Sequence, residues 1–149
     1  MTIEAVRPQT NDSRWAAVEE MRYKAEGTAP FRDITRQVLF QDPALACELR
    51  YFEMQPGGYS TLERHEHTHA VMIQRGAGQV LVGDRVYHVR EHDLVHIPAL
   101  TWHQFRAHED APFGFLCMVN ATRDRPQLPA ADDLDALRRD PTVAAFIRL

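Results

Sequence analysis

The chain has 149 residues, of which 44% are apolar and 26% are charged, and its formal net charge is −4. This size and composition are typical of one globular domain with a full core. We expect no nucleic-acid partner, because there is no basic block, and no membrane association, because no apolar run reaches roughly 18 residues. Two cysteines and no export signal predict free thiols in a cytoplasmic protein.

The first part of the chain contains two recognisable segments before the pattern becomes regular. A short helix is predicted after Asp12 and Ser13, and an extended run covers Phe31–Phe40. The next strand, Cys47–Glu53, is predicted to end at the turn sequence Pro56-Gly57-Gly58.

Short apolar runs separated by turn residues follow at regular spacing. Gly83-Asp84 has the chemistry of a two-residue hairpin loop. This spacing predicts an all-β sandwich or barrel and disfavours alternating βαβ units. The expected strands are Val71–Gln74, Gln79–Val82, Arg85–Val89, Leu94–Ile97, Trp102–Phe105 and Phe113–Val119.

The last part of the chain changes to a helical pattern. Three aspartates, from Asp132 to Asp135, precede two arginines, which is the charge order that a helix dipole favours. Asp140-Pro141 reads as an N-cap followed by proline at the first helical position, and predicts a helix over Thr142–Leu149. The chain is therefore divided into an N-terminal segment (1–45), a β-rich region (46–120) and a C-terminal extension with short helices (121–149).

Seven of the eight histidines lie between His65 and His103, which predicts a metal site. On a strand, Glu63 and His65 face the same side, and a tight turn over 66–68 returns His69 to the same point. His103, on a short strand far along the chain, is the fourth candidate ligand. Three imidazoles and one carboxylate favour a divalent transition metal over calcium or magnesium: manganese is expected, with iron, nickel and zinc as alternatives.

His67 is the ambiguous member of this cluster. In a shifted register it replaces Glu63 as a ligand, but its place in the turn favours an exposed or supporting role. The alternative for the whole HxHxH segment is a solvated surface hairpin. The order of turn, ligand cluster, glycine and distant histidine favours the metal site over that alternative.

These residues resemble the cupin superfamily. Its first motif, Gly-x5-His-x-His-x3-4-Glu-x6-Gly, is matched in spacing by Gly57, Glu63, His65, His69 and Gly76, with Glu and His exchanged at two positions. Of the second motif, only the proline and the metal-binding histidine are present: Pro98 and His103 stand, while His92, Leu100 and Ala107 replace two glycines and an asparagine. The resemblance implies a double-stranded β-helix (jelly-roll barrel) over 46–120 with a metal inside.

The resemblance also implies a homodimer, in which segment 1–45 packs on the barrel or on the dimer partner. A closer resemblance is to the small bacterial cupins that include the methylsulfurylases of methylthioxylulose 5-phosphate. It is carried by stretches at residues 50–60, 101–105, 114–120 and 123–126 and by the helical tail. It implies an enzyme that removes the methylthio group with a thiol such as glutathione and releases 1-deoxyxylulose 5-phosphate.

That reaction needs a nucleophile for sulfur and an anchor for phosphate. Cys117 is the candidate nucleophile, and its alternative role is a small buried apolar side chain. For the phosphate, Arg50, Arg106 and Lys24 stay open. Two other functions also remain: a dioxygenase that uses the same metal ligands, and a non-catalytic sensor or storage protein whose metal only orders the barrel.

Overall fold

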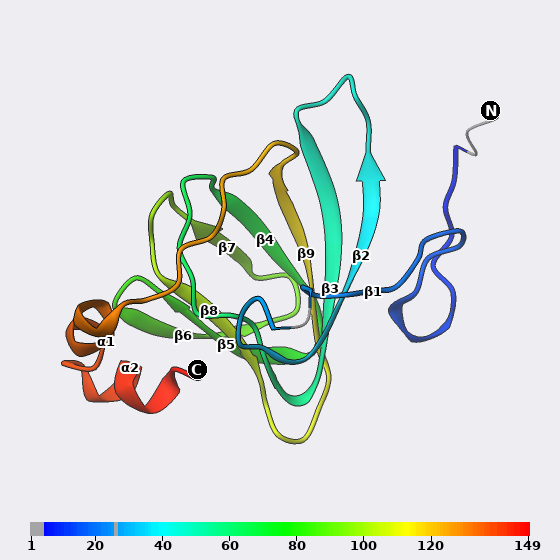
Figure 1. Ribbon diagram of the computed structural model, residues 1–149. Helices are drawn as coiled ribbons and strands as arrows, with labels where there is room; N and C mark the ends of the chain where they lie inside the picture. Colours follow the sequence, from blue (N-terminus) through cyan, green and yellow to red (C-terminus); the bar gives the residue numbers. More distant parts are fainter. Residues whose placement is uncertain (1–4, 26) are drawn as a thin grey trace.

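The computed structural model describes residues 5–25 and 27–149, and most of this chain is β-structure (Figure 1). The strands are β1 (Met21–Arg22), β2 (Arg32–Gln41), β3 (Cys47–Tyr59), β4 (His69–Arg75), β5 (Ala77–Val82), β6 (Arg85–Arg90), β7 (Leu94–Ile97), β8 (His103–Ala107) and β9 (Phe113–Asn120). Two helices follow, α1 (Ala131–Leu137) and α2 (Pro141–Phe146). The expected all-β fold with short C-terminal helices is confirmed.

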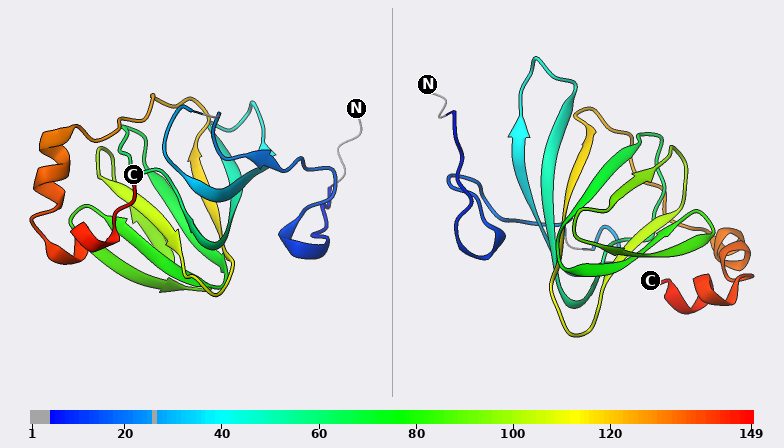
Figure 2. Two further views of the ribbon diagram at one scale, coloured as in Figure 1. Left: turned by 60° about the horizontal axis from the view of Figure 1, so that its bottom comes forward. Right: turned by 180° about the vertical axis from the view of Figure 1, so that it is seen from behind.

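The strands form one antiparallel sheet that curls on itself. Its order is β6-β5-β8-β3-β9-β4-β7, and β2 adds to the other edge of β3 with β1 beyond it. Figure 2 shows the curl from two further directions, with β5, β6 and β8 folded over towards β4, β7 and β9. Closing a sheet in this way lets its inner face bury an apolar core and surround a cavity.

The long strand β3 differs from its prediction, because it continues through the glycine pair. Gly57 adopts a φ of +76°, a left-handed conformation that glycine permits, and the pairing with β2 shifts register near this point. The strand therefore bends at this point without ending, and Tyr59 pairs with both Arg32 and Arg106. This bend links the two halves of the curled sheet.

Side-chain alternation along β5 divides the apolar residues between two cores. Val80 faces inward to the main core, which also contains Phe52, Phe105 and Phe115, whereas Leu81 faces the opposite side. There it packs with residues of α1 and α2, which cover that outer face. Full burial of one such leucine contributes about 2 kcal/mol.

The N-terminal turn differs from its prediction, and the last helix ends at Phe146, earlier than the predicted Leu149. In place of a helix after Asp12 and Ser13, the structure has a single 3-10 turn, η1 (Asn11–Ser13), because both residues adopt positive φ angles that an α-helix does not accommodate. The predicted cap of α2 is confirmed: the Asp140 carboxylate accepts hydrogen bonds from the backbone of Thr142 and Val143. None of the helices in the described part of the chain has the length and apolarity of a membrane span.

Candidate metal centre

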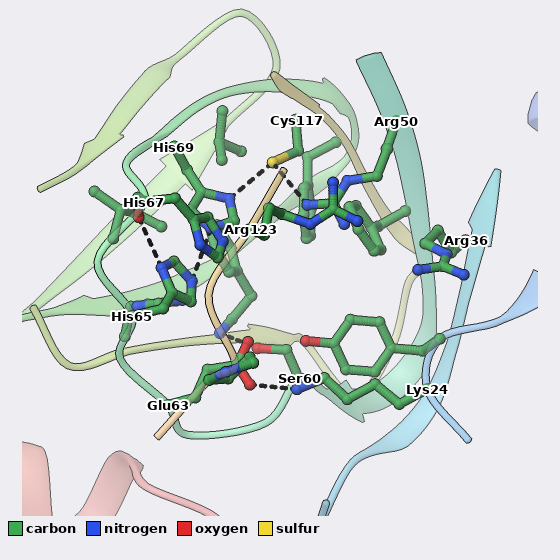
Figure 3. A pocket seen from close by; sticks show the side chains of 18 of the residues that line it. Lys24, Arg36, Arg50, Ser60, Glu63, His65, His67, His69, Cys117 and Arg123 are labelled. Carbon is green, nitrogen blue, oxygen red and sulfur yellow. Dashed lines mark hydrogen bonds and ion pairs between the residues drawn. The ribbon is translucent and has the colours of Figure 1, made fainter. Parts of the chain in front are cut away.

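A cavity of about 190 Å³ opens inside the curled sheet (Figure 3). Its walls come from the inner faces of β2, β3, β4, β7, β8 and β9, and from the loop between β3 and β4. Most of its polar side chains are histidines or basic residues. The cavity therefore contains the histidine cluster that the sequence predicts.

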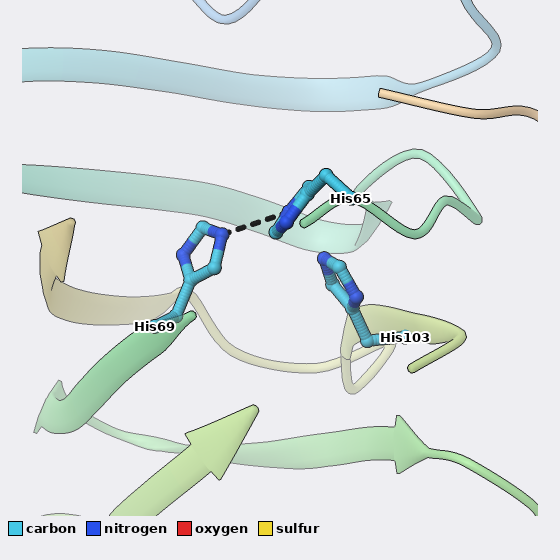
Figure 4. Close-up of side chains that lie close together, drawn as sticks. All are labelled: His65, His69 and His103. Carbon is cyan, nitrogen blue, oxygen red and sulfur yellow. Dashed lines mark hydrogen bonds between the residues drawn. The ribbon is translucent and has the colours of Figure 1, made fainter. Parts of the chain in front are cut away.

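Three histidines converge at one side of this cavity (Figure 4). His65 lies in the loop after β3, His69 begins β4, and His103 begins β8. One ring nitrogen from each lies within 4.8 Å of the others. Two backbone hydrogen bonds join Glu63 to His103, which places the loop before His65 directly opposite β8. We refer to His65, His69 and His103 as the histidine pole.

Backbone carbonyls determine which nitrogen of two of these rings carries a proton. Nδ1 of His65 lies 2.7 Å from the carbonyl oxygen of His67, and Nδ1 of His103 lies 2.9 Å from that of Thr101. A carbonyl oxygen only accepts, so each Nδ1 donates and Nε2 of the neutral ring keeps a lone pair, which in His65 faces Nε2 of His69 2.8 Å away. Histidines that bind metals are oriented in this way.

The histidine pole is uncharged at neutral pH. Burial, followed by the neighbouring His103, lowers the pKa of His65 to about 4 and that of His69 to about 2. Burial also lowers the pKa of His103. Neutral imidazoles with free lone pairs are the form that coordinates a divalent transition metal, so the donor set fits such an ion.

Glu63 lines the same cavity but stands apart from the three nitrogens. Its carboxylate forms an ion pair with Lys24, which reaches over from the N-terminal segment. Figure 3 shows this pair on the lower side of the cavity. The role of Glu63 as a ligand therefore stays a prediction.

His67 is buried, which excludes the exposed position and leaves the supporting role of its two expected alternatives. It stacks on His65 with the ring centroids 3.6 Å apart, and its Nδ1 lies 2.6 Å from Asp124 Oδ1. The Asp124 carboxylate also accepts the backbone N–H groups of Glu66 and His67, and these bonds hold its pKa well below its usual range. Asp124 thus holds the loop that carries His65 in place.

Cys117 points into the cavity from β9, the central strand of this wall. Its position in the register is opposite Arg50 on β3 and opposite Val71 on β4, which is two residues from His69 and on the same face of that strand. The Cys117 Sγ atom lies 2.9 Å from Nδ1 of His69 and 3.7 Å from a terminal nitrogen of Arg50. Burial raises the pKa of this thiol, and the charge of Arg50 opposes that effect.

The chain is similar to a known family of proteins. A model described as "Cupin domain" matches residues 50–119. The 1-methylthio-D-xylulose 5-phosphate methylsulfurylase of Rhodospirillum rubrum is 57% identical over 141 residues, which cover 95% of this chain and 90% of that protein. The chain belongs to the cupin family.

Solved structures agree with this assignment over nearly the whole chain. A cupin 2 conserved barrel domain protein from Rhodopseudomonas palustris is 60% identical with a TM-score of 0.92, covering 97% of this chain and 100% of that one. A cupin-2 domain protein from Rhodospirillum rubrum is 56% identical with a TM-score of 0.86, covering 96% of each. The jelly-roll barrel expected from the resemblance is therefore confirmed.

Of the three basic residues that the sequence offers as phosphate anchors, two line the cavity of this cupin and one does not. Arg50 and Lys24 line the cavity, but Arg106 donates a hydrogen bond to the carbonyl of Phe146 in α2 and is not part of the lining. Arg36 and Arg123 do line it, and sequence reasoning gave neither a role. The alternation of apolar Ile34 and Val38 around Arg36 was the available signal that this side chain faces inward.

Proposed function

We propose that this cupin transfers the methylthio group of 1-methylthio-D-xylulose 5-phosphate to a thiol, releasing 1-deoxy-D-xylulose 5-phosphate. The name of the 57% identical relative supports this substrate. The observation that carries the proposal is the contact between the Cys117 sulfur and Nδ1 of His69 inside the histidine-lined cavity. It brings a sulfur nucleophile next to a candidate metal ligand.

The proposed metal ligands are the three residues of the histidine pole together with Glu63, which would exchange its ion pair with Lys24 for the metal. A divalent metal held there would supply Lewis-acid polarisation of the substrate ketone. We propose manganese as the ion. His67 and Asp124 support the site by fixing the loop around His65.

Cys117 is the proposed nucleophile. Its sulfur attacks the sulfur of the methylthio group, so that an S–S bond forms and the bond from sulfur to the sugar carbon breaks. The electron pair of that broken bond passes to the sugar, whose carbon takes up a proton and becomes a methyl group. The sugar is reduced, and Cys117 is oxidised to a methyl disulfide.

A second thiol restores the enzyme by thiol–disulfide exchange. Its sulfur attacks the methylthio sulfur on Cys117, which releases a mixed methyl disulfide and the free cysteine. The thiol thus supplies both the electrons and the proton that the sugar gains. We propose glutathione as this thiol, and a homodimer as the working assembly.

His69 is placed to handle the proton of Cys117. With Nε2 of His69 serving as a ligand of the bound metal, the neutral ring would carry its proton on Nδ1 and donate it to the sulfur 2.9 Å away. This bond stabilises negative charge on sulfur both before attack and when the disulfide is resolved. Arg50, on the other side of the sulfur, acts in the same direction.

A turnover assay tests the proposal. Manganese-loaded protein is incubated with 1-methylthio-D-xylulose 5-phosphate and glutathione, and both products are measured by mass spectrometry. We expect deoxyxylulose phosphate and the methyl disulfide of glutathione in equal amounts. Absence of both products, with bound metal verified by elemental analysis, would contradict the proposed function.

The two cysteines offer a matched pair of variants. Cys117→Ser should lower turnover by at least about three orders of magnitude, as loss of a nucleophile does. Cys47→Ser should leave turnover unchanged, because Cys47 begins β3 and is not among the residues lining the cavity. Full activity of Cys117→Ser would show that the external thiol attacks the substrate directly.

A further inference from the structure

Three arginines approach one another on the side of the cavity away from the histidine pole. Arg36 is on β2, Arg50 is on β3, and Arg123 follows β9. In the β2–β3 register Arg36 lies opposite Phe52 and Arg50 lies opposite Val38, so the two arginines are diagonal neighbours. All three line the cavity, and we refer to them as the arginine cluster.

The arginine cluster carries more positive charge than its surroundings neutralise. Glu48 is its carboxylate partner: Glu48 Oε1 lies 2.7 Å from a terminal nitrogen of Arg123 and 3.7 Å from Nε of Arg50. Within the described part of the chain, the two acidic side chains that line the cavity are engaged elsewhere, Glu63 by Lys24 and Asp124 by His67. Three guanidinium groups beside one carboxylate leave two positive charges in excess.

Two of the guanidinium groups also have donors without a hydrogen-bond partner among the described residues. Nε of Arg36 and Nε of Arg50 are both buried and form no hydrogen bond. The Arg50 side chain is only 9% exposed, and within the described residues Arg36 forms no hydrogen bond or ion pair at all. Burial and the charges of Arg50 and Arg123 lower the pKa of Arg36. Buried charges and donors without partners are costly, so their retention indicates an anionic ligand.

A phosphate monoester matches this cluster. It carries about −1.5 to −2 charges at neutral pH, close to the excess of two, and has three acceptor oxygens for planar guanidinium donors. We propose that the arginine cluster binds the phosphate group of the sugar substrate, with Arg36 as its principal contact. The anion site follows from the cluster alone, whereas the sugar attached to it rests on the proposed function.

The position of the cluster suits a substrate bound at both ends. Figure 3 shows Arg36 and Arg50 across the cavity from His65 and His69, with Cys117 between the two groups. A phosphosugar held in this way places its phosphate against the arginines and its ketone end towards the histidine pole and the sulfur. Arg106, which is bonded to α2, takes no part.

Titration calorimetry on the metal-loaded protein tests this site without turnover. The probes are inorganic phosphate and 1-deoxy-D-xylulose 5-phosphate, the proposed product. Arg36→Met should weaken binding of both by at least about tenfold, the loss expected for charge-assisted hydrogen bonds. Arg36→Lys should restore part of the affinity, and Arg90→Met, an exposed arginine on β6, should leave it unchanged.

Thermal unfolding without phosphate separates a binding role from a structural one. Because Arg36 has no hydrogen-bond or ion-pair partner among the described residues and faces Arg50 and Arg123, Arg36→Met should raise the melting temperature of the free protein and reduce the further rise on adding phosphate. A lowered melting temperature, or phosphate affinity equal to that of the wild type, would overturn the proposal.

Steady-state kinetics distinguish the phosphosugar from the other anionic substrate, the thiol. We expect Arg36→Met to raise the KM for the phosphosugar and to leave the KM for glutathione unchanged. The reverse pattern would overturn the assignment in favour of the glutathione carboxylates. If wild-type protein binds both phosphate probes in an Arg36-dependent way but forms no deoxyxylulose phosphate from methylthioxylulose phosphate, the proposed function fails and the anion site stands.

Discussion

The two sides of the cavity satisfy their polar groups in opposite ways. At the histidine pole, His65 and His103 each donate Nδ1–H to a carbonyl, and the unprotonated Nε2 of His65 lies 2.8 Å from Nε2 of His69. In the arginine cluster, Arg36 and Arg50 leave buried Nε donors without hydrogen-bond acceptors among the described residues. One side is thus suited to a cation, and the other to an anion.

This difference shows how one small barrel recognises a substrate that carries a carbonyl and a phosphate. The neutral pole is suited to a metal, and the charged cluster is suited to an anion, as expected from donor and acceptor chemistry. Cys117 lies between them, in contact with His69 on one side and Arg50 on the other.

The largest expected effect on metal binding follows from removal of one residue of the histidine pole. His103→Ala should weaken metal binding by at least about a hundredfold, because even loss of a residue that supports a ligand costs 10- to 100-fold. Elemental analysis after dialysis measures this loss. Metal content equal to that of the wild type would remove His103 from the site, while phosphate-dependent stabilisation through Arg36 should persist in the variant.

Acidification should affect the histidine pole of the metal-free protein strongly. The folded-state pKa values of about 4 for His65 and about 2 for His69 lie below the value of about 6.5 in an unfolded chain. The unfolded state therefore binds more protons below about pH 6.5, and the free energy of unfolding falls as the pH falls through this window. Above about pH 7.5 both states are neutral and this loss disappears.

Melting temperatures between pH 7.5 and 5 measure this effect. His69→Gln keeps a polar side chain but cannot titrate in this range, so it should flatten the decline. A decline of the same steepness in His69→Gln would show that other groups cause the acid sensitivity.

The smallest expected effect distinguishes an arginine that stabilises the fold from the arginines that are proposed to bind phosphate. Arg106 donates to the Phe146 carbonyl and lies over the ring of that residue. Arg106→Met should lower the free energy of unfolding by about 1–2 kcal/mol, measured by urea denaturation, and leave phosphate affinity unchanged. Weakened phosphate binding would show that Arg106 contributes to the phosphate site.

The sequence predicts the histidine pole better than the arginine cluster, for a physical reason. Glu63, His65 and His69 are close along the chain, so a turn and the two-residue period of a strand bring them together. The alternation along β2 indicates the face on which Arg36 lies, but the pairing with β3 that brings it beside Arg50 is long-range and leaves no local pattern. The continuation of β3 through Gly57 was missed likewise, because a bulge and a turn share the same residues.

Asp124 shows a similar limit. It follows β9 in an irregular segment, yet it holds His67 and the backbone before it, a contact between residues 57 positions apart. Arg106 shows the converse, because its position in a β-strand gave no indication that helix α2 would occupy its donor. In both cases the partner is determined by tertiary packing.

In the proposed reaction, Cys117 carries the methylthio group between the sugar and the thiol. The most direct test mixes metal-loaded protein with 1-methylthio-D-xylulose 5-phosphate in the absence of any thiol, quenches with acid, and measures the mass of the intact protein and of its peptides. We predict that a methylthio group replaces the thiol hydrogen of Cys117, with one equivalent of deoxyxylulose phosphate released, and that glutathione removes this group. Formation of deoxyxylulose phosphate only after glutathione is added, with Cys117 unmodified throughout, would show that Cys117 does not carry the methylthio group.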